Sequence, residues 1–123
     1  MDIYLVRHTS LNADKAICYV QSEVHLASTF LQEASDTAKL IPDRHNAVFL
    51  ASPVRRCVQL AEYLSRRPSQ SDARLLDLNF GDWELKRWEQ IDQNALDEWM
   101  RNAVNLQCPN GESYTDLFNR TTA

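Results

Sequence analysis

Apolar residues along the chain fall into short continuous runs and into stripes with helical spacing, separated by polar segments. Residues 2–7 and 47–51 are two such runs, and they predict short strands buried in a parallel sheet. A weaker run at residues 74–78 predicts a third strand. Residues 8–28 are polar and have no period, so we expect a long loop there, of the kind that usually carries function or is disordered.

Signals for helix boundaries follow these runs. Thr29 and Gln32 resemble a capping box, apolar positions then recur at helical spacing, and Pro42 ends the helix. Ser52 and Pro53 open the next helix, as a capping hydroxyl followed by proline at the first helical position. The order strand, helix, strand, helix is typical of a parallel sheet with helices packed on its faces.

The second half of the chain is mostly helical in pattern. Residues 84–104 predict one or two amphipathic helices, and Ser113 with Asp116 forms a second capping box before a last helix. No linker or repeat interrupts this order. We therefore expect an α/β fold of three layers, with a mainly parallel central sheet between helices, in a single domain over residues 1–123. In such sheets ligands bind beyond the carboxyl ends of the strands.

Composition narrows the classes of function. Thirteen Lys and Arg against 17 Asp and Glu give a net charge of −4, which argues against nucleic acid as a partner. Two glycines cannot build a glycine-rich phosphate loop, so side chains would have to hold any phosphate. Three scattered cysteines indicate buried or idle thiols and no metal site. No apolar run approaches the ~20 residues of a membrane span, and the N-terminus lacks a basic leader, so we expect no membrane partner and a cytoplasmic setting.

Four residues at the expected strand ends could form an anion site. Arg7 and His8 follow the first strand, and Arg55 and Arg56 lie in the first turn of the helix after the second strand. Because the carboxyl ends of parallel strands meet at one edge of a sheet, these side chains can converge, and the helix N-terminus adds a further attraction for anions. Taken alone, a strand-end His or a first-turn Arg is more often a solvated side chain. Together they predict a phosphate pocket.

The glycine and tryptophan residues give weaker indications of their structural or functional roles. We expect Gly81 to serve a backbone conformation and Gly111 to mark a turn. Trp83, Trp88 and Trp99 could flank an aromatic substrate base, although core packing is the more common role of such residues.

Several segments resemble the histidine phosphatase (phosphoglycerate-mutase-like) superfamily. Residues 5–9 are similar to its first signature, residues 52–56 to its second arginine motif, residues 78–84 to its third block and residues 110–113 to a later one. These segments occur in the family's order. Residues 18–21, together with the third block, look most like the α-ribazole phosphatase branch.

The resemblance implies a phosphoglycerate-mutase-like fold and a phosphomonoesterase that needs no metal or cofactor. His8 would attack phosphorus and form a phosphohistidine, which requires a neutral imidazole. The resemblance assigns substrate binding to Arg7, Thr9, Gln21 and Arg56. A phosphoryl transition state spreads negative charge over three oxygens, and guanidinium groups suit that charge.

The leaving oxygen needs a proton, and the family supplies it from a Glu before the third block. Asp77 stands there in this chain, one methylene shorter, so we take Asp77 as the catalytic acid, with Glu84 as a nearby alternative. Glu84 could equally serve as a charge at a helix N-terminus. The resemblance favours α-ribazole 5′-phosphate, in cobalamin nucleotide-loop assembly, as the substrate. A phosphoglycerate mutase, a broad-specificity sugar phosphatase and an inert phosphate-binding fragment are the alternatives.

The family also carries a second active-site histidine on a strand near its C-terminus, which this chain does not reach. His25 and His45 are no replacement, since His25 is expected in a solvated loop and His45 at the wrong edge of the sheet. The resemblance implies that the missing strand lies between residues 2–7 and 47–51. Those two strands must then pair directly, leave an open seam or accept a strand from another chain, which could produce a homo-oligomer. We expect either a truncated product or a partial gene, with weak or no turnover.

Overall fold

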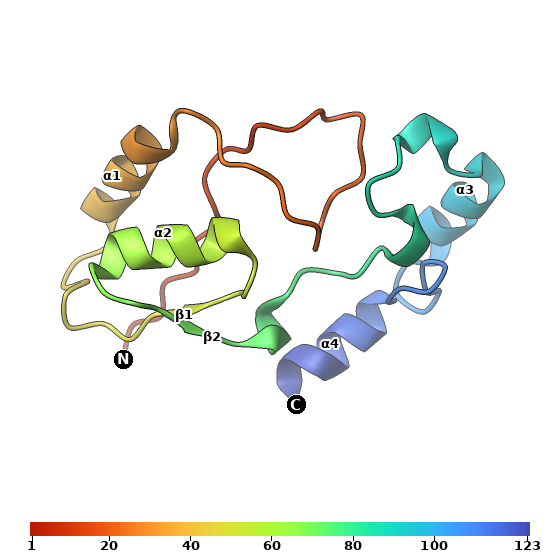
Figure 1. Ribbon diagram of the computed structural model, residues 1–123. Helices are drawn as coiled ribbons and strands as arrows, with labels where there is room; N and C mark the ends of the chain where they lie inside the picture. The colour runs from red at the N-terminus through yellow and green to blue at the C-terminus, as the bar shows by residue number, and fades with distance from the viewer. The chain divides into compact units, whose positions relative to one another are not determined.

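The computed structural model describes residues 1–123 (Figure 1). The chain divides into two compact units, each built from two separate segments of the sequence. Residues 1–12 and 24–73 form the first compact unit. Residues 13–23 and 74–123 form the second compact unit. The loop expected over residues 8–28 therefore contributes to both units.

The first unit holds two helices and two short strands. Its elements are α1 (Phe30–Leu40), β1 (Leu50–Ala51), α2 (Arg55–Ser65) and β2 (Gln70–Ser71). The strands β1 and β2 pair in parallel, with Leu50 opposite Gln70 and Ala51 opposite Ser71. A parallel pair joined through a helix confirms the predicted α/β class.

The core of the first unit lies between α1 and α2. Small and branched apolar side chains fill this core: Ala34, Ala38, Ile41, Leu60 and Leu64. Phe30 and Phe49 are partly buried and pack against them. Small residues at this contact allow the two helices to approach closely. The ring of Phe30 also meets the ring of Tyr63 edge-to-face, with centroids 6.0 Å apart.

Helix α1 lies where the sequence predicts it, but its first turn is held differently. The helix begins at Phe30 and ends just before Pro42. The Thr29 hydroxyl donates to the Glu33 carboxylate at 2.6 Å and makes no bond to a helix N–H, so the capping box expected from Thr29 and Gln32 is wrong.

The strands depart most from the prediction. Residues 2–7 form no strand, and their apolar side chains face solvent, with Leu5 95% exposed and Ile3 74% exposed. An isolated extended segment has no ladder partner, and direct pairing with β1 does not occur. The strand expected over residues 47–51 is reduced to the two residues of β1. The strand expected over residues 74–78 is also wrong, because the partner of β1 is β2, earlier in the chain.

Helix α2 begins later than its sequence signal. Ser52 and Pro53 precede the helix, whose first residue is Arg55 and whose N-cap is Val54. Val54 is 7% exposed, so packing of this side chain fixes where the helix begins and overrides the local capping signal. Arg55 lies in the first turn, as predicted, together with Arg56.

The second unit consists of short turns and two helices. They are η1 (Ala73–Leu75, at the boundary of the units), η2 (Gly81–Trp83), η3 (Trp88–Gln90), α3 (Gln93–Asn102) and α4 (Tyr114–Thr122). Of the helical stretch expected between residues 84 and 104, only η3 and α3 form. No helix in the structure combines the length and the apolar character that crossing a bilayer requires.

The core of the second unit is aromatic and contains two thiols. Its buried members are Cys18, Leu78, Trp83, Ile91, Trp99 and Cys108. This confirms core packing, rather than contact with a substrate base, as the role of the tryptophans Trp83 and Trp99. All three cysteines are free, and burial raises the pKa of the Cys18 thiol to about 12, which confirms an unreactive thiol there.

Two glycines allow two loops of the second unit to touch through their main chains. Gly81 has φ +54°, and a Cβ placed there would lie 2.1 Å from the carbonyl oxygen of Pro109. A Cβ on Gly111 would lie 2.4 Å from the carbonyl oxygen of Asn79. Only glycine fits at both places, which confirms the backbone role expected for Gly81 and extends it to Gly111.

Candidate functional site

The His8 ring is held in one orientation by its own neighbour. His8 is half-buried in the first unit, and its Nδ1 lies 2.7 Å from the Thr9 carbonyl oxygen. A carbonyl oxygen only accepts hydrogen bonds, so Nδ1 is the donor, and in a neutral ring with this hydrogen bond Nε2 has the lone pair. The ring is therefore in the tautomer that lets Nε2 act as a nucleophile.

Buried hydroxyl groups without partners lie in the same unit. Thr9 is 5% exposed, and its Oγ1 has no hydrogen-bond partner. The Ser52 Oγ, in the segment that precedes α2, is also buried without a partner. An unsatisfied buried hydroxyl costs about 1–3 kcal/mol, so such groups are retained where something else fills their hydrogen bonds. The Ser69 Oγ of this unit is buried without a partner as well.

The beginning of α2 is positively charged. Arg55 and Arg56 lie in its first turn, which contains no acidic residue. Arg56 is only 2% exposed, which is rare for a guanidinium, whereas Arg55 and Arg7 are exposed. The helix N-terminus adds its own partial positive charge. Arg7, His8, Thr9 and Arg56 all belong to the first unit.

Gln21 and Asp77, the other two predicted site residues, belong to the second unit and touch each other. The Gln21 Nε2 donates to the main-chain carbonyl oxygen of Asp77 at 2.7 Å. The Asp77 residue is exposed, and its carboxylate is engaged in no hydrogen bond. The loop of Gln21 and the segment of Asp77, 56 positions apart in sequence, are thus fixed to each other.

Glu84 is fully committed to the loop that carries Gln21. Its carboxylate accepts the main-chain N–H groups of Val20 at 3.2 Å and Gln21 at 3.1 Å, and the Ser22 hydroxyl at 2.5 Å. Burial would raise the pKa of Glu84, but these hydrogen bonds outweigh burial and lower the pKa below its ordinary value of 4.5. An ionised carboxylate has no proton to give, so the geometry argues against Glu84 as the acid. No helix begins there either.

Arg120 and Glu112 form a second fixed point that sequence reasoning missed. The Arg120 Nε and Nη2 donate to the two carboxylate oxygens of Glu112, at 2.8 and 3.0 Å. The remaining donors reach three main-chain carbonyls, at 3.0, 3.0 and 3.2 Å: those of Arg74, Leu76 and Asp77. The Glu112 hydrogen bonds raise the pKa of Arg120, and Arg120 lowers the pKa of Glu112. The only sequence signal here was Glu112, within the motif at residues 110–113.

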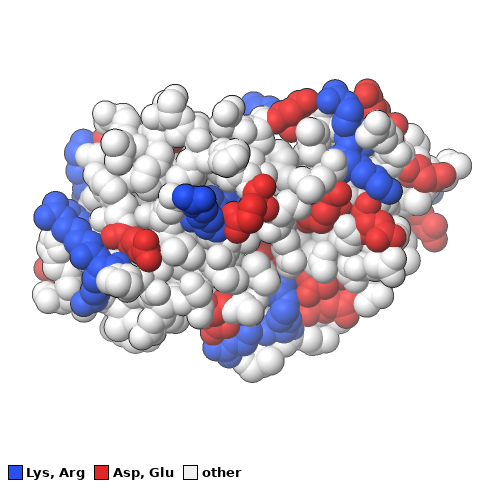
Figure 2. Space-filling model, viewed as in Figure 1, with Lys and Arg blue, Asp and Glu red and all other residues white.

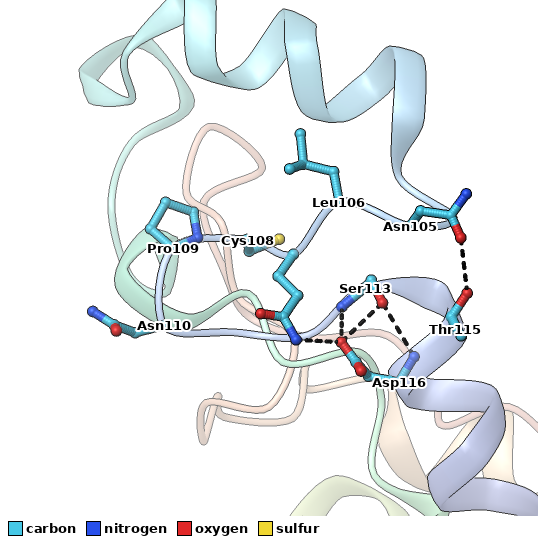
Figure 3. Close-up of a pocket in the computed structure, with 9 residues that line it drawn as sticks. Asn105, Leu106, Cys108, Pro109, Asn110, Ser113, Thr115 and Asp116 are labelled. Atoms are coloured by element: carbon cyan, nitrogen blue, oxygen red, sulfur yellow. Dashed lines mark hydrogen bonds between the residues drawn. The ribbon is translucent and has the colours of Figure 1, made fainter.

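A hollow beside the beginning of α4 is not a ligand site. Its lining runs from Asn105 to Asp116, and Figure 3 shows bonds between Asn105 and Thr115 and around Asp116. Asp116 accepts from Ser113 and from Gln107, and its bonds with Ser113 confirm the predicted capping box. The Thr115 hydroxyl donates to the Val104 carbonyl oxygen. The carboxylate of Asp116 is thus engaged in capping α4 and in holding Gln107.

Neither the remaining histidines nor the surface suggests a different kind of site. His25 and His45 are exposed, as expected. No group of three or more His, Cys, Asp or Glu side chains is arranged to hold a metal ion. In Figure 2 basic and acidic side chains are interspersed over the face shown, without one large basic patch.

Comparison with known proteins points to one family. The family described as the histidine phosphatase superfamily (branch 1) matches residues 3–123. Among solved structures, the alpha-ribazole phosphatase from Shigella flexneri is similar with a TM-score of 0.77 and 22% sequence identity, over 94% of this chain and 60% of that protein. A mycobacterial glucosyl-3-phosphoglycerate phosphatase is similar with a TM-score of 0.80 and 22% identity, over 93% and 57%. No curated protein gives a significant match. The chain thus spans less than two thirds of these two structures.

Proposed function

Because this chain belongs to the histidine phosphatase superfamily, we propose that it hydrolyses a phosphate monoester through a phosphohistidine formed at His8. The observation that supports this most directly is the hydrogen bond from His8 Nδ1 to the Thr9 carbonyl oxygen. It leaves the Nε2 lone pair for attack on phosphorus. A histidine held only by packing would have no need of this orientation.

In the proposed first step, Nε2 of His8 forms a bond to phosphorus while the bond from phosphorus to the leaving oxygen breaks. Water then hydrolyses the phosphohistidine, releases phosphate and restores the imidazole. The charge on the phosphoryl oxygens would be stabilised by the guanidinium groups of Arg7 and Arg56 and by the Thr9 hydroxyl. The burial of Arg56 and Thr9 supports this assignment, because electrostatic attraction and hydrogen bonds are stronger away from water.

The leaving oxygen requires a proton, and we propose Asp77 as its donor. The family has a Glu at this position, and Asp77 offers the same group with a shorter reach. Its exposed carboxylate makes no hydrogen bond that would hold it away from a substrate. Gln21, bonded to the Asp77 main chain, is proposed to contact the same substrate.

For the substrate we propose a small phosphorylated molecule, with α-ribazole 5′-phosphate favoured. Residues 18–21 and 78–84 resemble the α-ribazole phosphatase branch, and one similar structure is an alpha-ribazole phosphatase. A second similar structure is a glucosyl-3-phosphoglycerate phosphatase, so sugar phosphates and phosphoglycerates are the competing substrates. A cytoplasmic setting suits each of them.

The test is release of phosphate from p-nitrophenyl phosphate by the purified chain, the His8→Ala variant and the His25→Ala variant. His25 is an exposed histidine of the same unit and serves as the matched control. We expect His8→Ala to abolish turnover and His25→Ala to leave it unchanged. Acid-labile, base-stable labelling from a ³²P-labelled substrate should appear in the wild type and disappear in His8→Ala.

Other outcomes are equally informative. Turnover that survives His8→Ala would contradict the mechanism. A wild type that binds phosphate without releasing it from esters would be the inert phosphate-binding fragment. Comparison of α-ribazole 5′-phosphate with 3-phosphoglycerate and a sugar phosphate then ranks the substrates.

A further inference from the structure

The segment that carries Asp77 has no regular secondary structure of its own. Residues 76–80 belong to no helix or strand. The carbonyls of Arg74, Leu76 and Asp77 accept hydrogen bonds from the Arg120 guanidinium, at 3.0, 3.0 and 3.2 Å. A side chain of α4 therefore fills hydrogen bonds of this segment that a neighbouring strand would fill in a sheet.

The same guanidinium is itself fixed. Its Nε and one Nη2 hydrogen bond hold both carboxylate oxygens of Glu112. The Glu112 Oε2 also accepts the Asn79 N–H at 2.9 Å, and the Glu112 N–H donates to the Asn79 carbonyl oxygen at 2.8 Å. Arg120 thus holds the segment before Asp77, and Glu112 holds it after Asp77.

This arrangement requires arginine. Five hydrogen bonds use the five N–H donors of one planar guanidinium, two of them on one carboxylate. A lysine offers three donors from one point and could not reach both sides of the segment. The side chain of Arg120 is 24% exposed and that of Glu112 is 19% exposed, so water competes little with these bonds.

The contact is made with the main chain of Asp77 and leaves its carboxylate available. The Asp77 carbonyl oxygen accepts from Arg120 and from Gln21. The carboxylate accepts no hydrogen bond, although it lies close enough to Arg120 to act on its charge. Arg120 pairs with the carboxylate of Glu112 and contacts Asp77 only through its main-chain carbonyl oxygen.

We propose that Arg120 is a positioning residue that holds the Asp77 segment so that the Asp77 carboxyl can donate its proton to the leaving oxygen. This rests on the proposed function, in which Asp77 is the acid. Arg120 touches neither substrate nor phosphate. It acts through the main chain of residues 74–77.

The test compares two leaving groups. A general acid matters for an alkyl phosphate such as 2-glycerol phosphate, whose alkoxide leaves poorly, and hardly matters for p-nitrophenyl phosphate. We expect Arg120→Met to lower kcat for 2-glycerol phosphate about tenfold more than for p-nitrophenyl phosphate, within the ~10²–10⁴-fold worth of a general acid. Asp77→Asn should show the same selective loss, and the double variant no further one. Arg101→Met is the matched control, because Arg101 makes one bond to the Asp97 carbonyl oxygen on α3.

Equal loss on both substrates, or additive losses in the double variant, would overturn the proposal. If Arg120→Met does not fold, as judged by tryptophan fluorescence, Arg120→Lys and Glu112→Gln take its place with the same ratio as readout. A wild type that forms no phosphohistidine overturns the proposed function and this inference together. Normal phosphohistidine formation with an unchanged ratio overturns the inference alone.

Discussion

The two compact units differ in how far the hydrogen-bonding groups of their polar side chains are paired. In the first unit the hydroxyls of Thr9, Ser52 and Ser69 are buried without partners. In the second unit the Glu84 carboxylate accepts at least three hydrogen bonds, and the Arg120 guanidinium makes at least five. The Nε1 of Trp99 is the exception there, since it is buried without a partner.

This difference separates groups that hold the fold from groups kept for something outside it. A saturated carboxylate or guanidinium stabilises the loops that it joins and has nothing left for a ligand. A buried hydroxyl without a partner destabilises the empty protein and is satisfied when an anion arrives. The saturated groups of the second unit therefore hold its loops together, and we propose that groups of the first unit meet phosphate.

The largest effect should come from the main-chain contact in the second unit. Gly81→Ala places a Cβ against the Pro109 carbonyl oxygen at a positive φ, and we expect a loss of at least about 3 kcal/mol of unfolding free energy. Urea denaturation followed by tryptophan fluorescence measures it, because all three tryptophans (Trp83, Trp88, Trp99) lie in this unit.

Leu85→Gly is the matched control for Gly81→Ala. Leu85 has φ +64° and is 64% exposed, so glycine relieves strain there and removes little packing. We expect a gain of about 1 kcal/mol. If Gly81→Ala unfolds like the wild type, the close contact of the two loops is not what holds this unit.

A smaller loss of unfolding free energy is expected when the hydrogen bonds of the Glu84 carboxylate are weakened. Glu84→Gln removes the charge from three hydrogen bonds and should cost about 1–3 kcal/mol at neutral pH, measured by the same denaturation. The folded-state pKa of Glu84 lies below its ordinary value of 4.5, so ionised Glu84 stabilises the fold above that pH. This contribution is lost as pH falls through the folded-state pKa.

The difference between wild type and Glu84→Gln should therefore shrink in acid. Glu89→Gln is the control, since the side chain of Glu89 is 74% exposed and pairs with Arg87 on the surface. We expect that control to change stability by less than about 1 kcal/mol at any pH. A Glu84→Gln effect that does not depend on pH would refute the assignment of an ionised loop cap.

The smallest effect concerns the basic residues at the beginning of α2 in the first unit. Arg56→Ala should weaken binding of phosphate or vanadate at least about tenfold, because a buried charged donor is lost. Arg55→Ala, one residue earlier and exposed, should change the affinity much less. Isothermal titration measures both. Equal losses would mean that net charge at the beginning of α2, rather than a built pocket, attracts the anion.

Elements fixed by nearby residues could be predicted from the sequence. The capping box at the beginning of α4 joins Ser113 and Asp116, three positions apart, and it forms as predicted. The limits of α1 follow from its apolar period and from Pro42. Such signals need only the chain within one turn of the helix.

Elements that need a distant partner could not be predicted. Residues 2–7 have the composition of a strand, but a strand exists only where another strand pairs with it. Residues 74–78 form no strand, since the partner of β1 is β2, and the carbonyls of Arg74, Leu76 and Asp77 accept hydrogen bonds from Arg120, more than 40 positions later. Helix α2 begins at Arg55 because Val54 packs into the interior.

In the candidate site, too, features set by nearby residues could be predicted from the sequence and features set by distant contacts could not. Motif resemblance could select His8 and Asp77, since residue identity within a short segment is enough. The tautomer of His8 and the pairing of Gln21 with the Asp77 carbonyl depend on coordinates. The sequence left two roles open for Glu84, an alternative catalytic acid or a charge at a helix N-terminus. The hydrogen bonds of its carboxylate fit neither role.

Residues 13–23 belong to the second unit although the segments before and after them belong to the first, and this arrangement affects the rate of folding. Hydrogen bonds that close this unit join Val20 with Glu84, 64 positions apart, and Gln21 with Asp77, 56 positions apart. Closing such long loops is entropically costly and slows folding, whereas α1 and α2 lie close together along the chain. We expect the α1–α2 pair to assemble early, and the tryptophan-rich unit to mature only after the chain has returned to the loop that it left sixty residues before.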